Sequence, residues 1–404
     1  MNTAMASPEL SSQFDPFSMA FRQDPLAWHA RLLSESPGFM TLEGIPSAYV
    51  ATHEHNMAVL RDPRRFSSVK PANLPGMERV DFFNGQPVMN YSDDPDHARR
   101  RKVVAAAFTP RRVQEIGGAV QDLIDELLAP IRTGATAEFY KQVCQPLGAR
   151  VMLGLFMNVA REDQSIFLNY VSTLPLLDQL RPGEPKPRAF LEAWDKGRCY
   201  CRAAIEHTRR TGAQSLIGLI SSAQEGGALT DDEMMAMMTV LFTGGFPTIA
   251  SAAASALYRL SENAELAERI RRDSTIAPKF LEECLRIDSP VTLVMRFAME
   301  DVEIGGKIIR RGMPVYAMLS VANRDPKEFP DPARIDVDRP NLRHVAFGNG
   351  IHVCIGNSIA RAAIPRLINT VVQRFPNLHP EPAQPVQWET TPRSRHMGRV
   401  CLAT

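Results

Sequence analysis

One short window, FGNGIHVCIG at residues 347–356, constrains the fold of this chain more than any other part of the sequence. It places Cys354 after two closely spaced glycines and two residues before a third, Gly356. Glycine lets the backbone turn sharply and approach a flat ligand where a side chain would collide. A helical pattern follows over residues 357–374, so the thiol is expected to face the free N–H groups of a helix N-terminus, which favour a thiolate. The window therefore predicts a cysteine ligand in a glycine-rich loop.

The alternative to a ligand is a buried structural cysteine beside a glycine turn. A thiolate held against a planar cofactor is, however, the arrangement that haem iron uses for O–O bond cleavage. The window resembles the haem-binding loop of the cytochrome P-450 family. The resemblance implies haem b with its iron axially ligated by Cys354, and it places Phe347, Gly348 and Gly356 against the cofactor.

Composition agrees with a large globular enzyme. The 404 residues are 44% hydrophobic and 23% charged, enough to bury a substantial core, and the net charge of +1 gives no field that would attract nucleic acid or a membrane surface. Six scattered cysteines without a C-x-x-C pair predict no disulfide scaffold and favour a reducing cytoplasm. The first residues lack a basic start and an apolar core, so no signal peptide is expected.

Residues 234–258 carry no charge, and their length would suit a membrane span. They also contain glycines, threonines, serines and a proline, so we interpret them as a helix buried on all sides of a soluble domain. Asp231 and Asp232 stand where acidic side chains suit the start of that helix.

Helical periodicity dominates the rest of the chain. Further helices are predicted at 25–35, 96–108, 113–131, 143–158, 162–177, 187–210, 263–272 and 276–287. A strand is predicted at 47–52, and residues 302–318 alternate around Gly305-Gly306, a hairpin turn. Residues 323–343, rich in Pro, Asp and Arg, predict an ordered loop.

These elements predict a mainly α protein, and the resemblance implies the cytochrome P-450 fold, a large helical region around a buried central helix with small β-sheets. We expect a single domain over 1–404, because no repeat or linker interrupts it. Its β-rich parts are expected near 38–70 and 295–320, and its helical core near 96–290 and 355–375.

Four side chains match positions at which the family contacts the two haem propionates, which need cationic or hydrogen-bonding partners. They are His97, Arg101, Arg296 and His352. His97 and Arg101 are four residues apart and therefore share one face of a predicted helix. The alternative for any one of them alone is a solvated side chain.

An acid and an arginine, Glu283 and Arg286, lie one helical turn apart, and most such pairs are surface pairs of little consequence. Here the resemblance implies a buried network with Arg339 that supports the cysteine loop. These residues are expected to be structural, not catalytic.

A cationic run on the same predicted helix as His97 continues beyond it: Arg99, Arg100, Arg101, Lys102, Arg111 and Arg112. Such a run is usually a solvated face. The resemblance implies instead a docking site for a ferredoxin-type electron donor, which an NAD(P)H reductase would supply. No nucleic acid and no membrane anchor are expected.

The central helix departs from the family at its oxygen-activation motif. The motif has an acid directly before a threonine, whereas here Pro247 precedes Thr248, after Gly244. Proline removes a backbone donor and is expected to kink the helix near Gly244. The missing carboxylate removes the usual proton relay, so protons would come from ordered water, Ser251 or the substrate. The alternative is a tolerated proline with water relays intact.

A second departure lies in the helix after the cysteine. The family often has an acid there, whereas this chain has Ala363 and Pro365. Pro365 is expected to kink or strain the helix.

Substrate contacts follow only from the register with the family. They are Phe82, Phe83, Val240, Thr243, Phe246, Val291, Val294 and Met397, with Leu74, Val80, Thr292, Leu293 and Gly244 as neighbours. This lining has no charged anchor, so we expect a largely apolar or aromatic substrate.

The leading interpretation is a haem-thiolate monooxygenase that uses O2 and electrons from NAD(P)H through a ferredoxin. An alternative keeps the haem but uses peroxide, or oxidises a substrate that provides its own protons, as in aryl coupling or dehydrogenation. A third interpretation is a haem sensor or carrier without turnover. The sequence does not identify the substrate, the redox partner or the oligomeric state.

Overall fold

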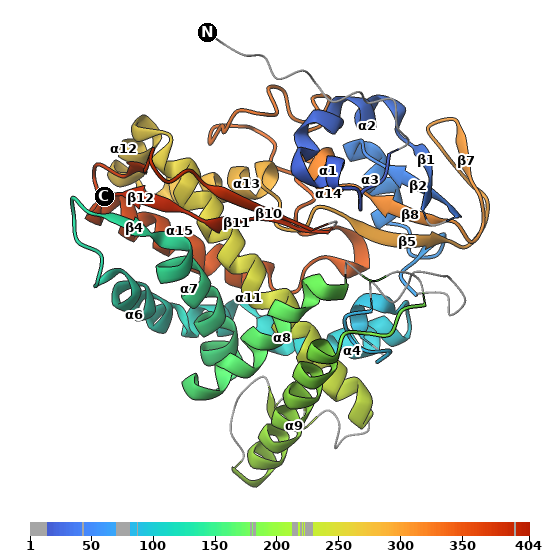
Figure 1. Ribbon diagram of the computed structural model, residues 1–404, viewed down its shortest axis with the longest axis horizontal. Coiled ribbons are helices and arrows are strands. Elements are labelled where there is room, and N and C mark those ends of the chain that lie inside the picture. The colour runs from blue at the N-terminus through green and yellow to red at the C-terminus, as the bar shows by residue number, and fades with distance from the viewer. Residues whose placement is uncertain are drawn as a thin grey trace.

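The computed structural model describes residues 14–42, 44–69, 81–86, 88–177, 180, 183–211, 217–218, 220, 222, 229–391 and 393–404. Within this part the chain is mainly helical, and its longest helix, α11 (Asp231–Ser261), crosses the middle of the molecule (Figure 1). The other α-helices are α1 (Met19–Gln23), α2 (His29–Glu35), α3 (His53–Leu60), α4 (Asp96–Ala105), α5 (Pro110–Glu115), α6 (Gly117–Leu128), α7 (Gln145–Ala149), α8 (Gln164–Leu177), α9 (Arg188–Thr211), α12 (Ala264–Arg272), α13 (Ala277–Ile287), α14 (Leu319–Ala322) and α15 (Asn357–Arg374).

The strands form small sheets. Five of them make one mixed sheet in the order β1-β2-β8-β5-β3, which lies on one side of α11, opposite α6, α7 and α12 (Figure 1). The order β4-β12-β9 makes a second sheet, and β6-β7 and β10-β11 are hairpins. The bounds are β1 (Gly38–Leu42), β2 (Ile45–Val50), β3 (Phe66–Ser67), β4 (Thr136–Glu138), β5 (Val294–Ala298), β6 (Val302–Ile304), β7 (Lys307–Ile309), β8 (Pro314–Ala317), β9 (His379–Pro380), β10 (Gln387–Thr390), β11 (Arg395–Arg399) and β12 (Cys401–Ala403).

The uncharged segment is a core helix, as predicted. Thr230 caps α11 and forms a capping box with Glu233, which fixes where the helix begins. The stretch Ala236–Ser261 is long and apolar enough for a membrane span, but 72% of its most apolar part is buried inside the protein. Its composition therefore reflects its central position among the other helices.

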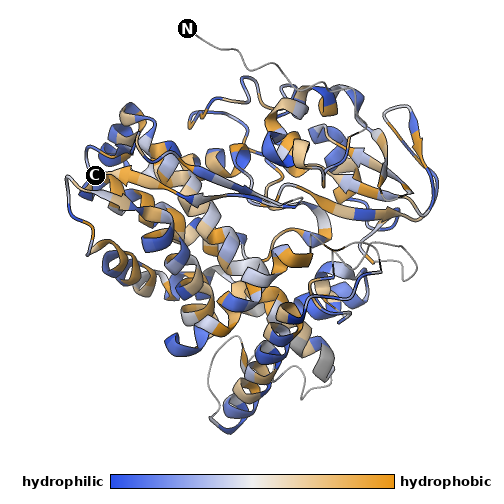
Figure 2. Cartoon of the chain, viewed as in Figure 1, coloured by the Kyte–Doolittle hydropathy of each residue, from blue (hydrophilic) through white to orange (hydrophobic). Residues whose placement is uncertain are grey.

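The predicted helices are all present, although several are divided. Residues 25–35 form a 3-10 turn, η1 (Pro25–Trp28), followed by α2, and 113–131 divides into α5 and α6. Residues 143–158 contain α7 between two π-helical segments, η5 (Tyr140–Cys144) and η6 (Arg150–Phe156). The Gly305-Gly306 hairpin is confirmed, with φ angles of 54° and 74° that glycine tolerates. Figure 2 shows α9 with alternating hydrophilic and hydrophobic bands, as its amphipathic pattern requires.

The two prolines that were expected to kink helices lie inside them without ending them. α11 continues through Pro247 and α15 continues through Pro365, so the expected kinks do not interrupt either helix. Each proline still lacks the N–H that would bond one turn back. The structure gives no functional account of Pro365, which is buried.

Close packing fixes α11 against α7. A Cβ added to the buried Gly148 would lie 2.4 Å from the carbonyl oxygen of Phe246, so only glycine lets α7 approach the α11 backbone at this level. The contact lies directly beside Pro247 and Thr248. The position of α11 thus depends on a residue without a side chain.

Replacing Gly148 by alanine is expected to lower the free energy of unfolding by about 1–3 kcal/mol, the usual cost of overpacking a core. Gly118 is the matched control, because it lies in the exposed part of a helix and a Cβ there meets nothing within 4 Å. Its alanine variant should be as stable as the wild type, or more stable by up to about 1 kcal/mol. Denaturant unfolding of both variants tests this, and equal stabilities would contradict the packing argument.

Candidate active site

Glycine shapes the cysteine loop at two positions. Gly348 and Gly350 have φ angles of 68° and 71°, and a Cβ on Gly350 would also lie 2.2 Å from the carbonyl oxygen of Leu60. Gly356 differs, because it caps α15 with a φ of −85° and an added Cβ would meet Cys354 Sγ only at 4.0 Å. The backbone conformation therefore favours glycine at positions 348 and 350. Neither the backbone nor the packing of the protein requires glycine at position 356.

The thiol of Cys354 retains accessible surface, although protein atoms surround it closely. Desolvation raises the pKa of the thiol above its ordinary value. The N–H groups of Gly356 and Asn357 and the charges of Arg101 and Arg361 lower that pKa, but less than desolvation raises it. The helix N-terminus therefore acts on the thiol in the expected direction, but desolvation outweighs it in the protein alone. A bound metal ion, which deprotonates a coordinating thiol, would supply the missing stabilisation.

Four side chains predicted to act together converge beside the loop: His97 and Arg101 from α4, Arg296 from β5, and His352. The rings of His97 and His352 lie 4.3 Å apart between centroids. Arg101 donates from Nη2 to the carbonyl of Val353 at 2.7 Å. Desolvation, together with the charges of Arg296, His97 and Arg101, lowers the pKa of His352 to about 3. The site thus disfavours a further positive charge.

Two of these groups keep unmet polar capacity among the described residues, although Nδ1 of His97 lies 3.3 Å from Oδ1 of Asp94. Arg296 is only 8% exposed, its Nη1 donates to the carbonyl of Met295 at 2.8 Å, and it forms no ion pair with a described carboxylate. Desolvation lowers its pKa to about 10. Nε2 of the buried His97 has no hydrogen-bond partner. Buried polar groups in this state cost free energy unless a ligand satisfies them, so the cluster fits the carboxylates of a haem.

The predicted oxygen-activation segment presents its two glycines to different surroundings. Gly244 is exposed, and a Cβ there would meet nothing within 4 Å, so open space adjoins the helix at this level. A Cβ on Gly245 would lie 2.6 Å from Cε of Met152 in η6. The hydroxyl of Thr248 donates to the Gly244 carbonyl at 2.8 Å, which leaves its oxygen able to accept a hydrogen bond.

The predicted substrate contacts divide into two groups. Phe82, Thr243, Val291 and Val294 keep part of their surface accessible. The others are buried in the main core: Phe83, Val240, Phe246 and Met397. Leu74 and Val80 lie outside the described residues.

The structure adds Arg393 to this region. Its guanidinium lies 4.2 Å from the ring centroid of Phe82, and its carbonyl accepts from the N–H of Thr292 at 2.8 Å. The turn between β10 and β11 thereby joins the loop before α4 to the segment after α13. No sequence signal indicated this, because that hairpin was not predicted.

The cations of the run divide between Glu233, the cysteine loop and the surface. Arg99 donates from Nη1 to Oε2 of Glu233 at 2.9 Å, and Arg100 donates from Nε to Oε1 of the same carboxylate at 2.9 Å. Glu233 is buried at the start of α11, so these two arginines connect α4 to α11. Arg101 points to the cysteine loop. The cations that remain at the surface are Lys102, Arg111 and Arg112.

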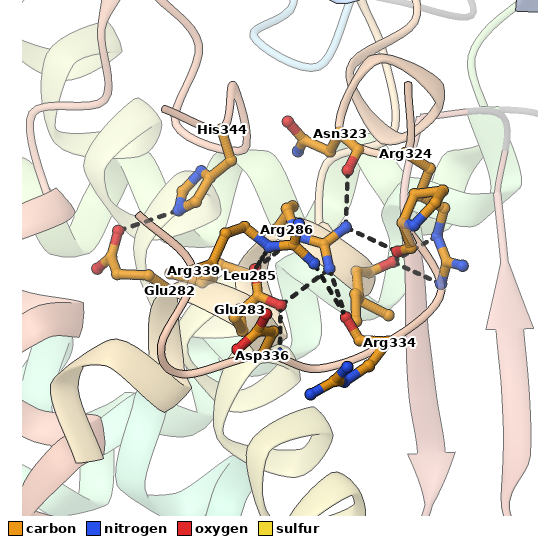
Figure 3. Close-up of polar contacts among 12 residues, drawn as sticks. Glu282, Glu283, Leu285, Arg286, Asn323, Arg324, Arg334, Asp336, Arg339 and His344 are labelled. Carbon is orange, nitrogen blue, oxygen red and sulfur yellow. Dashed lines mark hydrogen bonds and ion pairs between the residues drawn. The ribbon is translucent and has the colours of Figure 1, made fainter. Parts of the chain in front are cut away.

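The Glu283–Arg286 pair is fully buried, each residue being 0% exposed. Arg286 donates to both oxygens of Glu283, at 2.6 and 2.9 Å, and to the carbonyls of Asn323, Pro332 and Arg334 (Figure 3). Nε of Arg339 reaches Oε1 of Glu283 at 3.2 Å. The predicted network is present and holds residues 323–339 against α13.

Comparison with known proteins gives one consistent result. The sequence profile of the family "Cytochrome P450" matches residues 188–394. The chain is 30% identical over 403 residues to cytochrome P450 monooxygenase PikC of Streptomyces venezuelae, with 94% of each chain covered. It is 32% identical to 6-deoxyerythronolide B hydroxylase of Saccharopolyspora erythraea, over 81% of this chain and 83% of that protein.

Solved structures of similar folds agree over nearly the whole chain. The cytochrome P450 PksS of Bacillus subtilis 168 superposes with a TM-score of 0.84 at 26% identity, covering 96% of this chain and 99% of that one. The tirandamycin C-bound P450 monooxygenase TamI gives a TM-score of 0.80 at 29% identity, covering 95% of this chain and 98% of that one.

Proposed function

Because this chain belongs to the cytochrome P450 family, we propose that it inserts one atom of O2 into a largely apolar or aromatic small molecule, with electrons from NAD(P)H through a reductase and a ferredoxin in the cytoplasm. The family is one of haem-thiolate monooxygenases, in which the bound haem supplies O2 activation at an iron held by a cysteine. The observation that carries the assignment of the site is the accessible Cys354 beside a cluster in which Nε2 of His97 has no hydrogen-bond partner and the buried Arg296 has no carboxylate partner among the described residues.

The residues divide by role. Cys354 ligates the iron, and Phe347, Gly348 and Gly356 pack against the cofactor. The propionates bind to His97, Arg101, Arg296 and His352. These roles rest on the match to the family and on the convergence of the side chains beside one loop.

Thr248 is the polar side chain proposed for the oxygen side of the site. Its hydrogen is directed to the Gly244 carbonyl, so its oxygen can accept a hydrogen bond from water or from a substrate hydroxyl. Pro247 offers neither a carboxylate nor an N–H. Ser251 is 5% exposed, which favours ordered water or the substrate over Ser251 as the proton source.

The electron donor is proposed to be an acidic ferredoxin at the surface around Lys102 and Arg111. The side chain of Arg111 is 91% exposed, and its ion pair with Glu115 is of the surface type that contributes little. Both cations therefore remain able to attract an acidic partner, and its association should weaken as salt rises.

A second candidate function follows from Pro247. Without the acid, the enzyme would use peroxide, or would oxidise a substrate that supplies its own protons, as in aryl coupling or dehydrogenation. Parallel assays with a ferredoxin system and with hydrogen peroxide separate the two. Turnover with the ferredoxin system supports the leading proposal, whereas turnover with peroxide alone contradicts it.

An optical titration of the ferric protein addresses the substrate. Terpenoids, aromatics, steroids and macrolides are added in turn, and a shift of the haem band to high spin identifies a ligand that displaces water from the iron. We expect such a shift from an apolar or aromatic compound. No shift from any class would indicate a carrier-bound or larger substrate and contradict the proposed substrate class.

If the missing acid limits proton delivery, replacing Pro247 by aspartate is expected to raise ferredoxin-driven turnover by about tenfold, less than the 10²–10⁴-fold that a positioned acid can contribute. The matched control is Pro247→Asn, which restores the backbone donor without an acid and should leave the rate unchanged. An equal gain in both variants would assign the effect to the backbone. No gain in either would place proton delivery on water or the substrate.

A further inference from the structure

Glu282 lies next to the buried network but serves a different part of the molecule. Its neighbour Glu283 faces the loop around Arg339, whereas Glu282 faces α15 and the cysteine loop, and Figure 3 shows it bonded to His344. Arg361 donates from Nε and Nη2 to the two oxygens of Glu282, at 2.8 Å each. This bidentate geometry is the strong form of a carboxylate–guanidinium pair.

His344 is the second side chain that bonds to Glu282. Its Nδ1 accepts from the N–H of Ala346 at 3.2 Å, so the ring proton lies on Nε2, which donates to Glu282 at 3.0 Å. Desolvation raises the pKa of Glu282, but the bonds from Arg361 and His344 more than offset it and lower that pKa to about 2. Glu282 is therefore ionised throughout the range in which an enzyme works.

Arg361 is connected to the backbone of Cys354 by two routes, each of which passes through one residue. Its guanidinium lies 4.7 Å from the ring centroid of Phe347, whose carbonyl accepts from the N–H of Cys354 at 2.8 Å. Its Nη1 donates to Oδ1 of Asn357 at 3.1 Å, and Nδ2 of Asn357 donates to the carbonyl of Cys354. The charge of Arg361 thus sits at the edge of the ligand loop, and Glu282 is the anion that balances it.

This placement has an electrostatic consequence. Reduction of a cysteine-ligated iron adds one negative charge to the site, so any fixed charge beside the loop changes the equilibrium between the two oxidation states. A positive charge favours the reduced state and a negative charge favours the oxidised state. With both partners present, their effects largely cancel.

We propose that Glu282 and Arg361 form a positioning pair that sets the reduction potential of the iron held by Cys354. The inference rests on the proposed role of Cys354 as the ligand. Neither residue touches the cofactor site directly. Glu282 neutralises Arg361, and Arg361 holds the loop through Phe347 and Asn357.

The test is the reduction potential of the haem-loaded protein, measured by spectroelectrochemistry on two single variants. Glu282→Gln leaves Arg361 unbalanced and should favour the reduced form by about tenfold, a rise of about 59 mV for one electron. Arg361→Gln leaves Glu282 unbalanced and should lower the potential by a similar amount. The double variant should return close to the wild-type value.

Shifts of the reduction potential in opposite directions would arise from charge and not from damage to the loop, because both variants break the same ion pair. Shifts of the same sign, or no shift in either, would overturn the proposal. If Glu282→Gln does not retain haem, Arg361→Gln alone decides, since the side chain of Arg361 is 45% exposed and the change is mild. An unchanged or raised potential in that variant then overturns the proposal.

Two controls complete the experiment. Glu268 also pairs with two arginines, Arg271 and Arg272, but Arg271 bonds to the carbonyl of Val372 near the far end of α15, so Glu268→Gln should leave the potential unchanged. The spectrum of the reduced carbon monoxide complex is recorded for every variant. A wild type without the thiolate signature would refute the proposed ligand itself, whereas an intact signature with same-sign shifts refutes only the role of this pair.

Discussion

An alanine at Arg286 will lower the free energy of unfolding by about 3–5 kcal/mol, the cost of removing one member of a buried ion pair. Among the described residues, the N–H of Asp336 and the guanidinium of Arg339 would be the remaining donors to Glu283, which is 0% exposed. The carbonyls of Asn323 and Pro332 would lose their donor at the same time, and that of Arg334 would keep only the longer bond from Nη2 of Arg339 at 3.4 Å. Their loop would detach from α13, and the protein should also retain less haem.

Chemical denaturation and haem content measure this effect together. The matched control is Arg272→Ala, because the side chain of Arg272 is 78% exposed in its pair with Glu268. The free energy of unfolding of that variant should change by no more than about 0.5 kcal/mol. An Arg286→Ala protein that unfolds at the wild-type denaturant concentration would contradict the structural role of the network.

Replacing Cys354 by serine will abolish monooxygenase turnover. The loss should exceed the roughly 10–100-fold that removal of an outer-shell partner costs, because the ligand itself is exchanged for a weaker donor. The fold should survive, since the loop is held by backbone bonds that serine keeps, among them the N–H of residue 354 to the carbonyl of Phe347 at 2.8 Å.

Substrate-dependent NAD(P)H consumption and product formation measure this loss. Cys199→Ser is the matched control, because Cys199 is an exposed free cysteine on α9. It should turn over as the wild type does. A Cys354→Ser enzyme with more than a few per cent of wild-type turnover would show that the proposed ligand is wrong.

Sequence patterns predicted most of the fold because it depends on periodicity and on local capping. The uncharged segment became α11, and α15 has the bounds expected from the residues after the cysteine. The short strands near the C-terminus were not predicted, because β9 and β12 are two and three residues long and form only through contacts distant in sequence. The polar helix α3 (His53–Leu60) was missed because its pattern of apolar residues is weak.

The site was predictable where a motif fixed the local backbone, and unpredictable where partners came from distant segments. The pairing of Glu283 with Arg286 and Arg339 followed from spacing and resemblance. The ion pairs of Arg99 and Arg100 with Glu233 could not be predicted from spacing, because the partners are far apart in the sequence. Thr230 and Glu233 have the spacing of a capping box, which indicated only where α11 begins.

Two features of the site depend on burial. The cationic run was expected to be a docking site or a solvated face, and the helix N-terminus was expected to favour a thiolate at Cys354. A buried carboxylate neutralises Arg99 and Arg100, and desolvation raises the pKa of the thiol more than the helix N-terminus lowers it. Neither the ion pairing of these arginines nor the raised pKa of the thiol can be predicted before the burial of each group is known.

The absorption spectrum of the reduced wild-type protein under carbon monoxide tests the central claim most directly. A haem iron held by the Cys354 thiolate should give a carbon monoxide band at the long wavelength that a strongly electron-donating ligand produces, and Cys354→Ser should lose it. A wild-type band at the shorter wavelength typical of a neutral ligand, or an unchanged band in Cys354→Ser, would contradict the assignment.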